Sequence, residues 1–142
     1  GGMVDGSSMA ASMALGAEGI LMGSRMVSSE ESPVHDNWKQ AIIDAAETDT
    51  VFLNRHTSPS LRALRTERSE ALEFDMETNA MTALIGTTQD LYFGGDMNAS
   101  LALAGQVVGR IDEIQPVRKI ISECAAECIQ ILEELSNKYS NK

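Results

Sequence analysis

Two glycine-bearing loops near the start of the chain, separated by one helix, constrain its fold more than any other feature. The loops are Gly1-Gly2 and Met22-Gly23-Ser24. Apolar and small residues with helical spacing occupy 9–14, and a uniformly apolar run, 19–22, leads into the second loop. A short apolar run bounded by glycines is typical of a strand buried on both faces of a parallel sheet. This order predicts a βαβ-type arrangement in an α/β fold, with both loops at the same edge of the sheet.

The composition fits one ordinary globular domain. Of the 142 residues, 43% are hydrophobic and 23% are charged, and a chain of this length can bury about two thirds of its unfolded surface. The net charge of −10, without any basic run, argues against nucleic acid or an anionic membrane as a partner. Two cysteines are too few for a secreted disulfide scaffold, and no apolar stretch reaches the length of a membrane span. We therefore expect a cytoplasmic protein.

The two glycine loops are suited to holding one phosphate group, because backbone N–H groups bind an anion whatever the net charge of the chain. In (β/α)₈ barrels, the loops after strands seven and eight and a short extra helix form such a site. The Ser24 hydroxyl would add a donor, and 25–27 could begin the short helix. Glycine pairs are also common as simple turns and helix ends, and Arg25 could either neutralise a phosphate or form an exposed ion pair. The spacing alone leaves these alternatives open.

Periodicity predicts the elements of the middle of the chain. A helix after Ser32-Pro33 places Trp38 and Ile42 on one face, and 50–53 has the composition of a strand. Charged residues punctuate apolar ones throughout 61–74, which predicts a solvated amphipathic helix.

The remaining elements are predicted to be helical. A helix is expected around 81–85, a break at Gly94-Gly95-Asp96, and a second helix capped by Asn98 and reaching 108. A long C-terminal helix follows Pro116, and 136–142 form a polar tail. The apolar seam of this helix has steps of four and three residues and consists of Val117, Ile121, Cys124, Cys128, Ile131 and Leu135.

An ordered series of short motifs runs from the first loop almost to the C-terminal helix. The series comprises Gly1-Gly2-Met3-Val4-Asp5-Gly6, the segment 14–25, Glu31-Ser32-Pro33 with His35 and Lys39, Asp49-Thr50, Arg62-Ala63-Leu64-Arg65, and the segment 100–106 with Gly109. In this order the motifs resemble the C-terminal half of the nitronate monooxygenases, formerly called 2-nitropropane dioxygenases. The resemblance covers residues 1–122, and its specificity comes from the series, since each piece alone is weak.

This resemblance implies that the chain is the C-terminal portion of a (β/α)₈ TIM barrel with additional C-terminal helices. It also implies FMN as a non-covalent cofactor, whose phosphate would lie on Gly2 and on Leu21, Met22, Gly23 and Ser24, with Gly1 close by. The expected division is 1–55 for the last barrel units with the FMN-phosphate loops, 56–97 for a lid-like insertion, and 98–142 for helices packing on the barrel.

The same resemblance implies a reaction, the oxidation of alkyl nitronates with dioxygen. The family's catalytic histidine lies in the N-terminal half of the barrel, and neither His35 nor His56 matches it. We therefore expect no catalytic residue here, an inactive chain on its own, and pairing with the N-terminal half of the barrel or with a second copy. His35 is interpreted as supporting a loop, and Cys124 and Cys128 as small apolar side chains without a metal.

Three alternatives stay open. The flavin-dependent enoyl-acyl-carrier-protein reductases are a related branch that shares the stretch Ala104-Gly105-Gln106. The barrel of inosine-monophosphate dehydrogenase fits 1–33 nearly as well, but it does not explain 62–65 or 100–106. The third alternative is a non-catalytic fragment or a subunit that binds a partner chain through exposed barrel edges.

Overall fold

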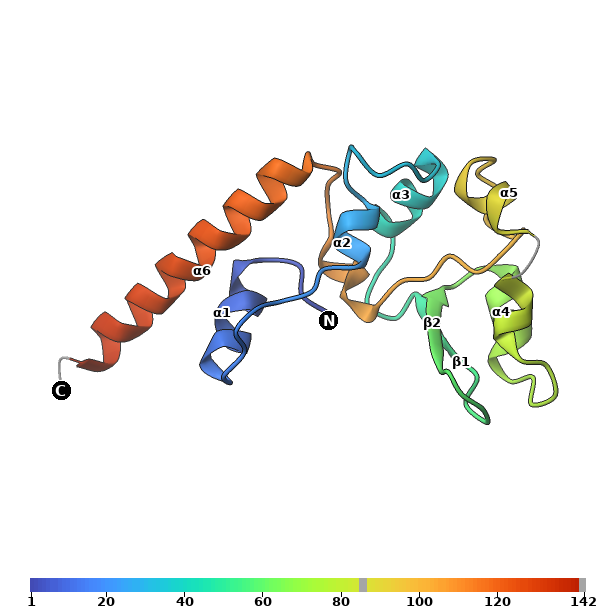
Figure 1. Ribbon diagram of the computed structural model, residues 1–142, viewed down its shortest axis with the longest axis horizontal. Coiled ribbons are helices and arrows are strands. Elements are labelled where there is room, and N and C mark those ends of the chain that lie inside the picture. Colours follow the sequence, from blue (N-terminus) through green and yellow to red (C-terminus); the bar gives the residue numbers. More distant parts are fainter. Residues whose placement is uncertain (85–86, 141–142) are drawn as a thin grey trace.

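The computed structural model describes residues 1–84 and 87–140 and has a mixed α/β architecture. Figure 1 shows an elongated arrangement in which α6 extends at one end with α1 alongside it, and the β1–β2 hairpin and α4 lie at the other end. The elements are α1 (Gly6–Ala14), α2 (Ser24–Val27), α3 (Asp36–Ile43), β1 (Thr50–Leu53), β2 (Leu61–Leu64), α4 (Glu67–Glu73), η1 (Ala80–Leu84), α5 (Thr88–Tyr92), η2 (Gln106–Arg110) and α6 (Val117–Ser140).

The helix expected between the two glycine loops is present as α1. Asp5 is its N-cap, and a capping box joins Asp5 to Ser8, whose backbone N–H lies 2.8 Å from the Asp5 carboxylate. The helix ends where Gly16 adopts a positive φ of 96°, a conformation that costs glycine little. The helix begins one turn before the apolar residues 9–14 that predicted it and ends with them at Ala14.

The strand predicted at 19–22 is not formed. In the described part of the chain the only sheet is the two-stranded β1–β2 pair, so no parallel neighbour is available for this segment. A strand exists only through hydrogen bonds to an adjacent strand, and Leu21 remains 73% exposed. The expected parallel βαβ pairing is thus corrected to a helix followed by an unpaired segment.

Residues 61–74 form a strand and a short helix rather than one amphipathic helix. β2 pairs antiparallel with β1 in the register Val51 with Ala63 and Leu53 with Leu61, which buries Ala63 and Leu64. The chain then turns, and Thr66 caps α4 through a capping box with Ser69. Pairing with β1 and burial of Ala63 and Leu64 outweigh the helical periodicity here. The hairpin also spans the boundary predicted between 55 and 56.

A third correction concerns the helix predicted for 98–108. Residues 101–104 are extended along β2, since the Leu64 N–H donates to the Ala102 carbonyl at 2.8 Å and the Ala104 N–H to the Arg62 carbonyl at 3.1 Å. Only the 3₁₀ turn η2 follows. The helix expected around 81–85 is likewise a 3₁₀ turn, η1, and Ile85 lies outside the described residues.

The long C-terminal helix is confirmed as α6, with two corrections. Ile120, Cys124 and Cys128 are its buried residues, whereas the predicted seam residues Ile121 and Leu135 are exposed. The helix also continues through most of the expected polar tail, because it ends at Ser140. None of the helices within 1–84 and 87–140 combines the length and apolar character that a membrane span requires.

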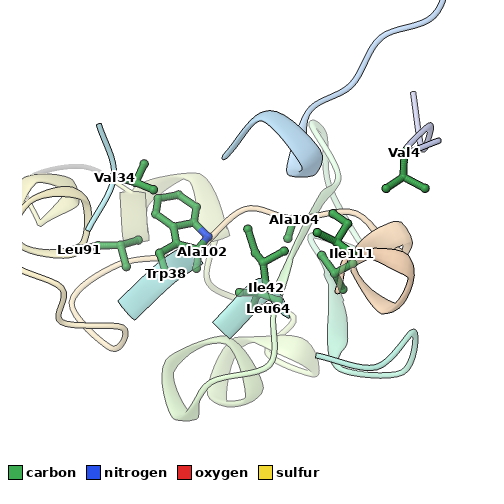
Figure 2. Packing of buried hydrophobic residues seen from close by; sticks show 10 residues of the cluster. Val4, Val34, Trp38, Ile42, Leu64, Leu91, Ala102, Ala104 and Ile111 are labelled. Atoms are coloured by element: carbon green, nitrogen blue, oxygen red, sulfur yellow. The ribbon is translucent and has the colours of Figure 1, made fainter. Parts of the chain in front are cut away.

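The main hydrophobic core joins segments between Val4 and Ile111 that are far apart in the sequence (Figure 2). Trp38 and Ile42 on α3 are buried in it, as predicted, and the Trp38 ring meets Tyr92 edge-on at a centroid distance of 4.9 Å. Val4, which follows the first glycine loop, belongs to the same cluster. The start of the chain is therefore tied to the core that supports α2 and α3.

Candidate functional site

The predicted phosphate-binding residues lie on two open loops. Gly1, Gly2, Leu21 and Gly23 are exposed and Met22 is half-buried. A Cβ added at Gly1, Gly2 or Gly23 would meet nothing within 4 Å. Gly2 also has a φ of 75°, which favours glycine. The backbone of both loops is therefore accessible to a ligand, as a phosphate site made of N–H groups requires.

The first loop is held in place by the N-terminus of α1. The Asp5 carboxylate accepts from the Ser7 hydroxyl at 2.9 Å and forms an ion pair with Arg110. Burial acts to raise the pKa of Asp5, but hydrogen bonds from Ser8 and Ser7 and the charge of Arg110 outweigh it and lower that pKa. Asp5 is consequently ionised at neutral pH and fixes the turn that follows Gly2.

A contact from α6 completes this support. The Gly6 N–H donates to Glu127 Oε2 at 2.8 Å. A Cβ at Gly6 would lie 2.5 Å from the Cys128 nitrogen and 2.7 Å from the Cys124 carbonyl oxygen. Only glycine allows α1 to approach α6 this closely. With Asp5 and Glu127 both at its N-terminus, α1 offers its first amides to carboxylates rather than to a phosphate.

The second loop leads into α2, and Ser24 is fixed by a residue distant in sequence. Gly23 is the N-cap of α2 and has no side chain. The first backbone N–H groups of α2 therefore receive no hydrogen bond from an N-cap side chain. The Ser24 side chain is buried, and its Oγ accepts from the Gly105 N–H at 2.9 Å. Among the described residues its hydroxyl donates to no acceptor. The loop thus presents backbone amides and one hydroxyl donor.

Arg25 occupies neither of the two positions considered from the sequence. Its side chain is buried, and it donates through Nη1 to the Glu113 carbonyl at 2.7 Å and through Nη2 to Gln115 Oε1. Burial lowers the pKa of Arg25, which the nearby carboxylates of Glu113, Asp112 and Glu123 oppose. The guanidinium is therefore neither an exposed ion pair nor a group that reaches the glycine loops.

The cavity beside Arg25 does not fit an anion. It has a volume of about 160 Å³ and lies between the start of α1, α2 and α6. Two arginines, Arg25 and Arg110, face five carboxylates, and a doubly charged phosphate would meet net repulsion there. The carboxylates are Asp5, Asp112, Glu113, Glu123 and Glu127. The backbone amides at Gly2 and at 21–24 are neutral donors without such carboxylates in their own segments, and they suit a phosphate better than this cavity does.

The other candidate residues have structural roles. His35 is the N-cap of α3, with Nδ1 accepting from the Asn37 N–H at 3.1 Å, and its ring packs on Gly95. This agrees with the prediction that His35 supports a loop. Cys124 and Cys128 are buried free thiols on α6, and burial raises the pKa of Cys124. Both behave as the small apolar side chains that were expected.

Gly105 is the site residue that sequence reasoning missed. The stretch Ala104-Gly105-Gln106 stood out in the sequence only as a motif shared by two branches, without a role. The structure brings its amide to Ser24, a contact between residues far apart in the chain. The only available signal was that both residues belong to the same ordered series of motifs.

Comparisons with known proteins place the chain in a family. A nitronate monooxygenase family model matches residues 1–127. A "Probable nitronate monooxygenase" from Staphylococcus saprophyticus is 43% identical over 67 residues, which make up 47% of this chain and 19% of that protein. Another, from Staphylococcus aureus, is 25% identical over 94% of this chain and 39% of its own length.

The fold has a solved relative as well. The structure of FabK from Thermotoga maritima matches with a TM-score of 0.88 and 36% identity, covering 97% of this chain and 45% of FabK. This chain thus spans less than half of the relatives it matches. The match from the glycine loops through η2 and into α6 shows that the chain belongs to the nitronate monooxygenase family.

Proposed function

We propose that this chain supplies the flavin-phosphate site of an FMN-dependent oxidoreductase that oxidises alkyl nitronates with dioxygen. The observation that carries the proposal is the pair of open glycine loops at Gly1-Gly2 and 21–24, with Ser24 fixed by the Gly105 amide. The family match also includes 62–65 and 100–106, which the inosine-monophosphate dehydrogenase alternative does not explain.

Each residue of the site has a defined part in the proposal. The amides of Gly2 and of Leu21, Met22 and Gly23 would donate to the phosphate oxygens, and Gly1 leaves room beside them. The Ser24 hydroxyl would donate one further hydrogen bond while its oxygen accepts from Gly105. Bound FMN would supply the electron transfer. In this proposal the chain itself binds and orients and contributes no catalytic base.

The unpaired segment 19–22 is the reason for proposing that another polypeptide segment covers this chain. Leu21 is 73% exposed and Leu15 is 90% exposed, while no strand of the described residues pairs with 19–22. In a (β/α)₈ barrel such a segment would pair on both sides with parallel strands. We therefore propose that the N-terminal half of a barrel covers this edge, in a cytoplasmic enzyme, and that the chain alone does not turn over substrate.

Flavin binding tests the loop assignment. The chain is titrated with FMN and with riboflavin, which lacks the phosphate, and flavin fluorescence is followed. Gly23→Asp places a carboxylate at the phosphate and is expected to weaken FMN binding by more than about tenfold, whereas Ser24→Ala removes one hydrogen bond and is expected to cost about three- to tenfold. Riboflavin affinity should not change.

Gly19→Asp is the matched control. It adds the same charge at a glycine that also has open space around its α-carbon, four residues before Gly23 and outside the 21–24 loop. FMN affinity that is unchanged in Gly23→Asp and Ser24→Ala, or that falls equally in Gly19→Asp, would contradict the loop assignment.

The likeness to FabK favours a second candidate, the flavin-dependent enoyl-acyl-carrier-protein reductase branch. The flavin-loaded barrel assembled from both halves distinguishes the two. Oxidation of an alkyl nitronate with dioxygen supports the first proposal. Reoxidation of the reduced flavin by an enoyl thioester, without nitronate turnover, supports the second.

A further inference from the structure

Arg25 is as deeply buried as Lys39, the other buried cation of the described residues, and its hydrogen bonds are unusual for a buried arginine. It is 6% exposed. The acceptors of its two terminal nitrogens are the neutral oxygens of the Glu113 backbone and the Gln115 amide, not carboxylates. Burying a cation is costly unless its hydrogen bonds fix it in one geometry. Such a group therefore connects two segments rigidly.

The segments that Arg25 connects are α2 and the linker that enters α6. Gln115 is held from several directions, because its backbone carbonyl accepts from the Glu30 N–H at 3.0 Å and its amide donates to Glu123 on α6 at 3.3 Å. Glu31 strengthens the same junction by accepting from the Val117 N–H at 2.8 Å. Arg25 thereby fixes α2 against a junction that is itself tied to α6.

Ser24, the preceding residue, is held by a different segment. Its Oγ accepts from the Gly105 N–H, while the Arg25 side chain lines the acidic cavity beside α6. The two adjacent side chains of α2 therefore hold this single helical turn between 105 and 113–115. A turn of four residues has little intrinsic stability, so its orientation depends on tertiary contacts, which include these two and the bond from the Glu30 N–H to the Gln115 carbonyl.

We infer that Arg25 is a positioning residue that orients the 21–24 loop and the Ser24 hydroxyl toward the flavin phosphate without contacting the phosphate itself. The inference rests on the proposed function for the identity of the ligand. A direct phosphate–arginine contact would depend mainly on the positive charge. The positioning role depends on the planar geometry of the guanidinium, which lysine does not reproduce.

Two variants separate geometry from charge. Arg25→Lys keeps the charge but loses the two-pronged contact with Glu113 and Gln115, and Gln115→Leu keeps Arg25 and removes one of its acceptors. The matched control is Arg55→Met. Arg55 lies in the loop of the distant β1–β2 hairpin, is half-exposed, and pairs with Glu73 of α4.

Two measurements are made on each variant of the full chain. The first is the ratio of the FMN and riboflavin dissociation constants. The second is amide hydrogen exchange at Gly105, which reports the Ser24 contact without any ligand. Arg25→Lys and Gln115→Leu are each expected to weaken FMN binding by about tenfold relative to riboflavin, and to accelerate exchange at Gly105 by at least about tenfold. Arg55→Met should change neither quantity.

The outcomes distinguish failure of this inference from failure of the proposed function. Parental FMN affinity and slow Gly105 exchange in Arg25→Lys would overturn the positioning role. Equal losses of FMN and riboflavin affinity would overturn it too, since they indicate general unfolding. If the parent chain does not prefer FMN over riboflavin, the proposed phosphate site fails, and the assignment of Arg25 to that site fails with it.

Discussion

Replacement of Gly6 by alanine tests the packing that supports the first glycine loop. An added Cβ would lie 2.5 Å from the Cys128 nitrogen and the Glu127 Cβ, and 2.7 Å from the Cys124 carbonyl oxygen. Two of these atoms belong to the backbone of α6, so no side-chain rotation relieves the clash. Ordinary contacts require about 3.5–4.0 Å. The variant must therefore separate α1 from α6 by about 1 Å.

The expected cost follows from two terms and one offset. Overpacking of this kind costs about 1–3 kcal/mol. Displacement also strains the bond from the Gly6 N–H to the Glu127 carboxylate, 2.8 Å long, and hydrogen bonds to charged groups contribute about 1.5–3 kcal/mol. The entropy gained on replacing glycine by alanine offsets about 0.4–1 kcal/mol. We expect a net destabilisation of about 2–4 kcal/mol.

Urea unfolding followed by far-ultraviolet circular dichroism measures this change, with Gly19→Ala as the control. Gly19 has open space around its α-carbon, so its replacement should alter the free energy of unfolding by less than about 0.5 kcal/mol. Glu127→Gln keeps the shape and removes the charge, and should cost about 1 kcal/mol. A Gly6→Ala variant as stable as the Gly19→Ala control would refute the close approach of α1 and α6.

Three further predictions concern other parts of the chain. Gly95→Ala should destabilise the chain by at least about 2 kcal/mol in the same assay, because Gly95 has a φ of 73° and its Cβ would lie 2.3 Å from His35 Nδ1. Burial alone would raise the pKa of Asp5, but hydrogen bonds, first among them the one from the Ser8 amide, lower that pKa overall. Asp5 thus contributes stability above its unfolded pKa of about 3.9; this stability is lost as pH falls through the lower folded pKa, and Asp5→Asn should flatten the stability profile below about pH 4. Iodoacetamide should alkylate Cys124 slowly in the native chain and rapidly in urea, because the thiol is buried and its pKa is raised; equal rates in both would contradict its burial.

Elements with strong local signals could be predicted from the sequence. Asp5 caps α1 and Gly16 ends it, as their residue types suggest. Trp38 and Ile42 show helical spacing, and both are buried on α3. These signals act within one or two turns of chain, so they do not depend on what the rest of the molecule does. The glycine loops were recognisable for the same reason.

Elements that depend on distant partners could not be predicted. Residues 61–64 and 101–104 both contain apolar residues at spacings compatible with a helix. They are extended because they hydrogen-bond to each other, and 61–64 also pairs with β1. The contact between Ser24 and Gly105 is of the same kind, as is the position of Arg25. Such pairings depend on tertiary burial, which outweighs local propensity.

The acidity of the chain is compatible with anion binding because its charges are segregated. The net charge is −10, and five carboxylates gather with Arg25 and Arg110 around the cavity between α1 and α6. The glycine loops carry no ionised side chain within 1–4 or 19–24, so the local field there comes from backbone dipoles. Anion affinity at the loops should therefore depend on the geometry of their backbone amides, which Asp5 and Glu127 support by fixing the start of α1 after the first loop.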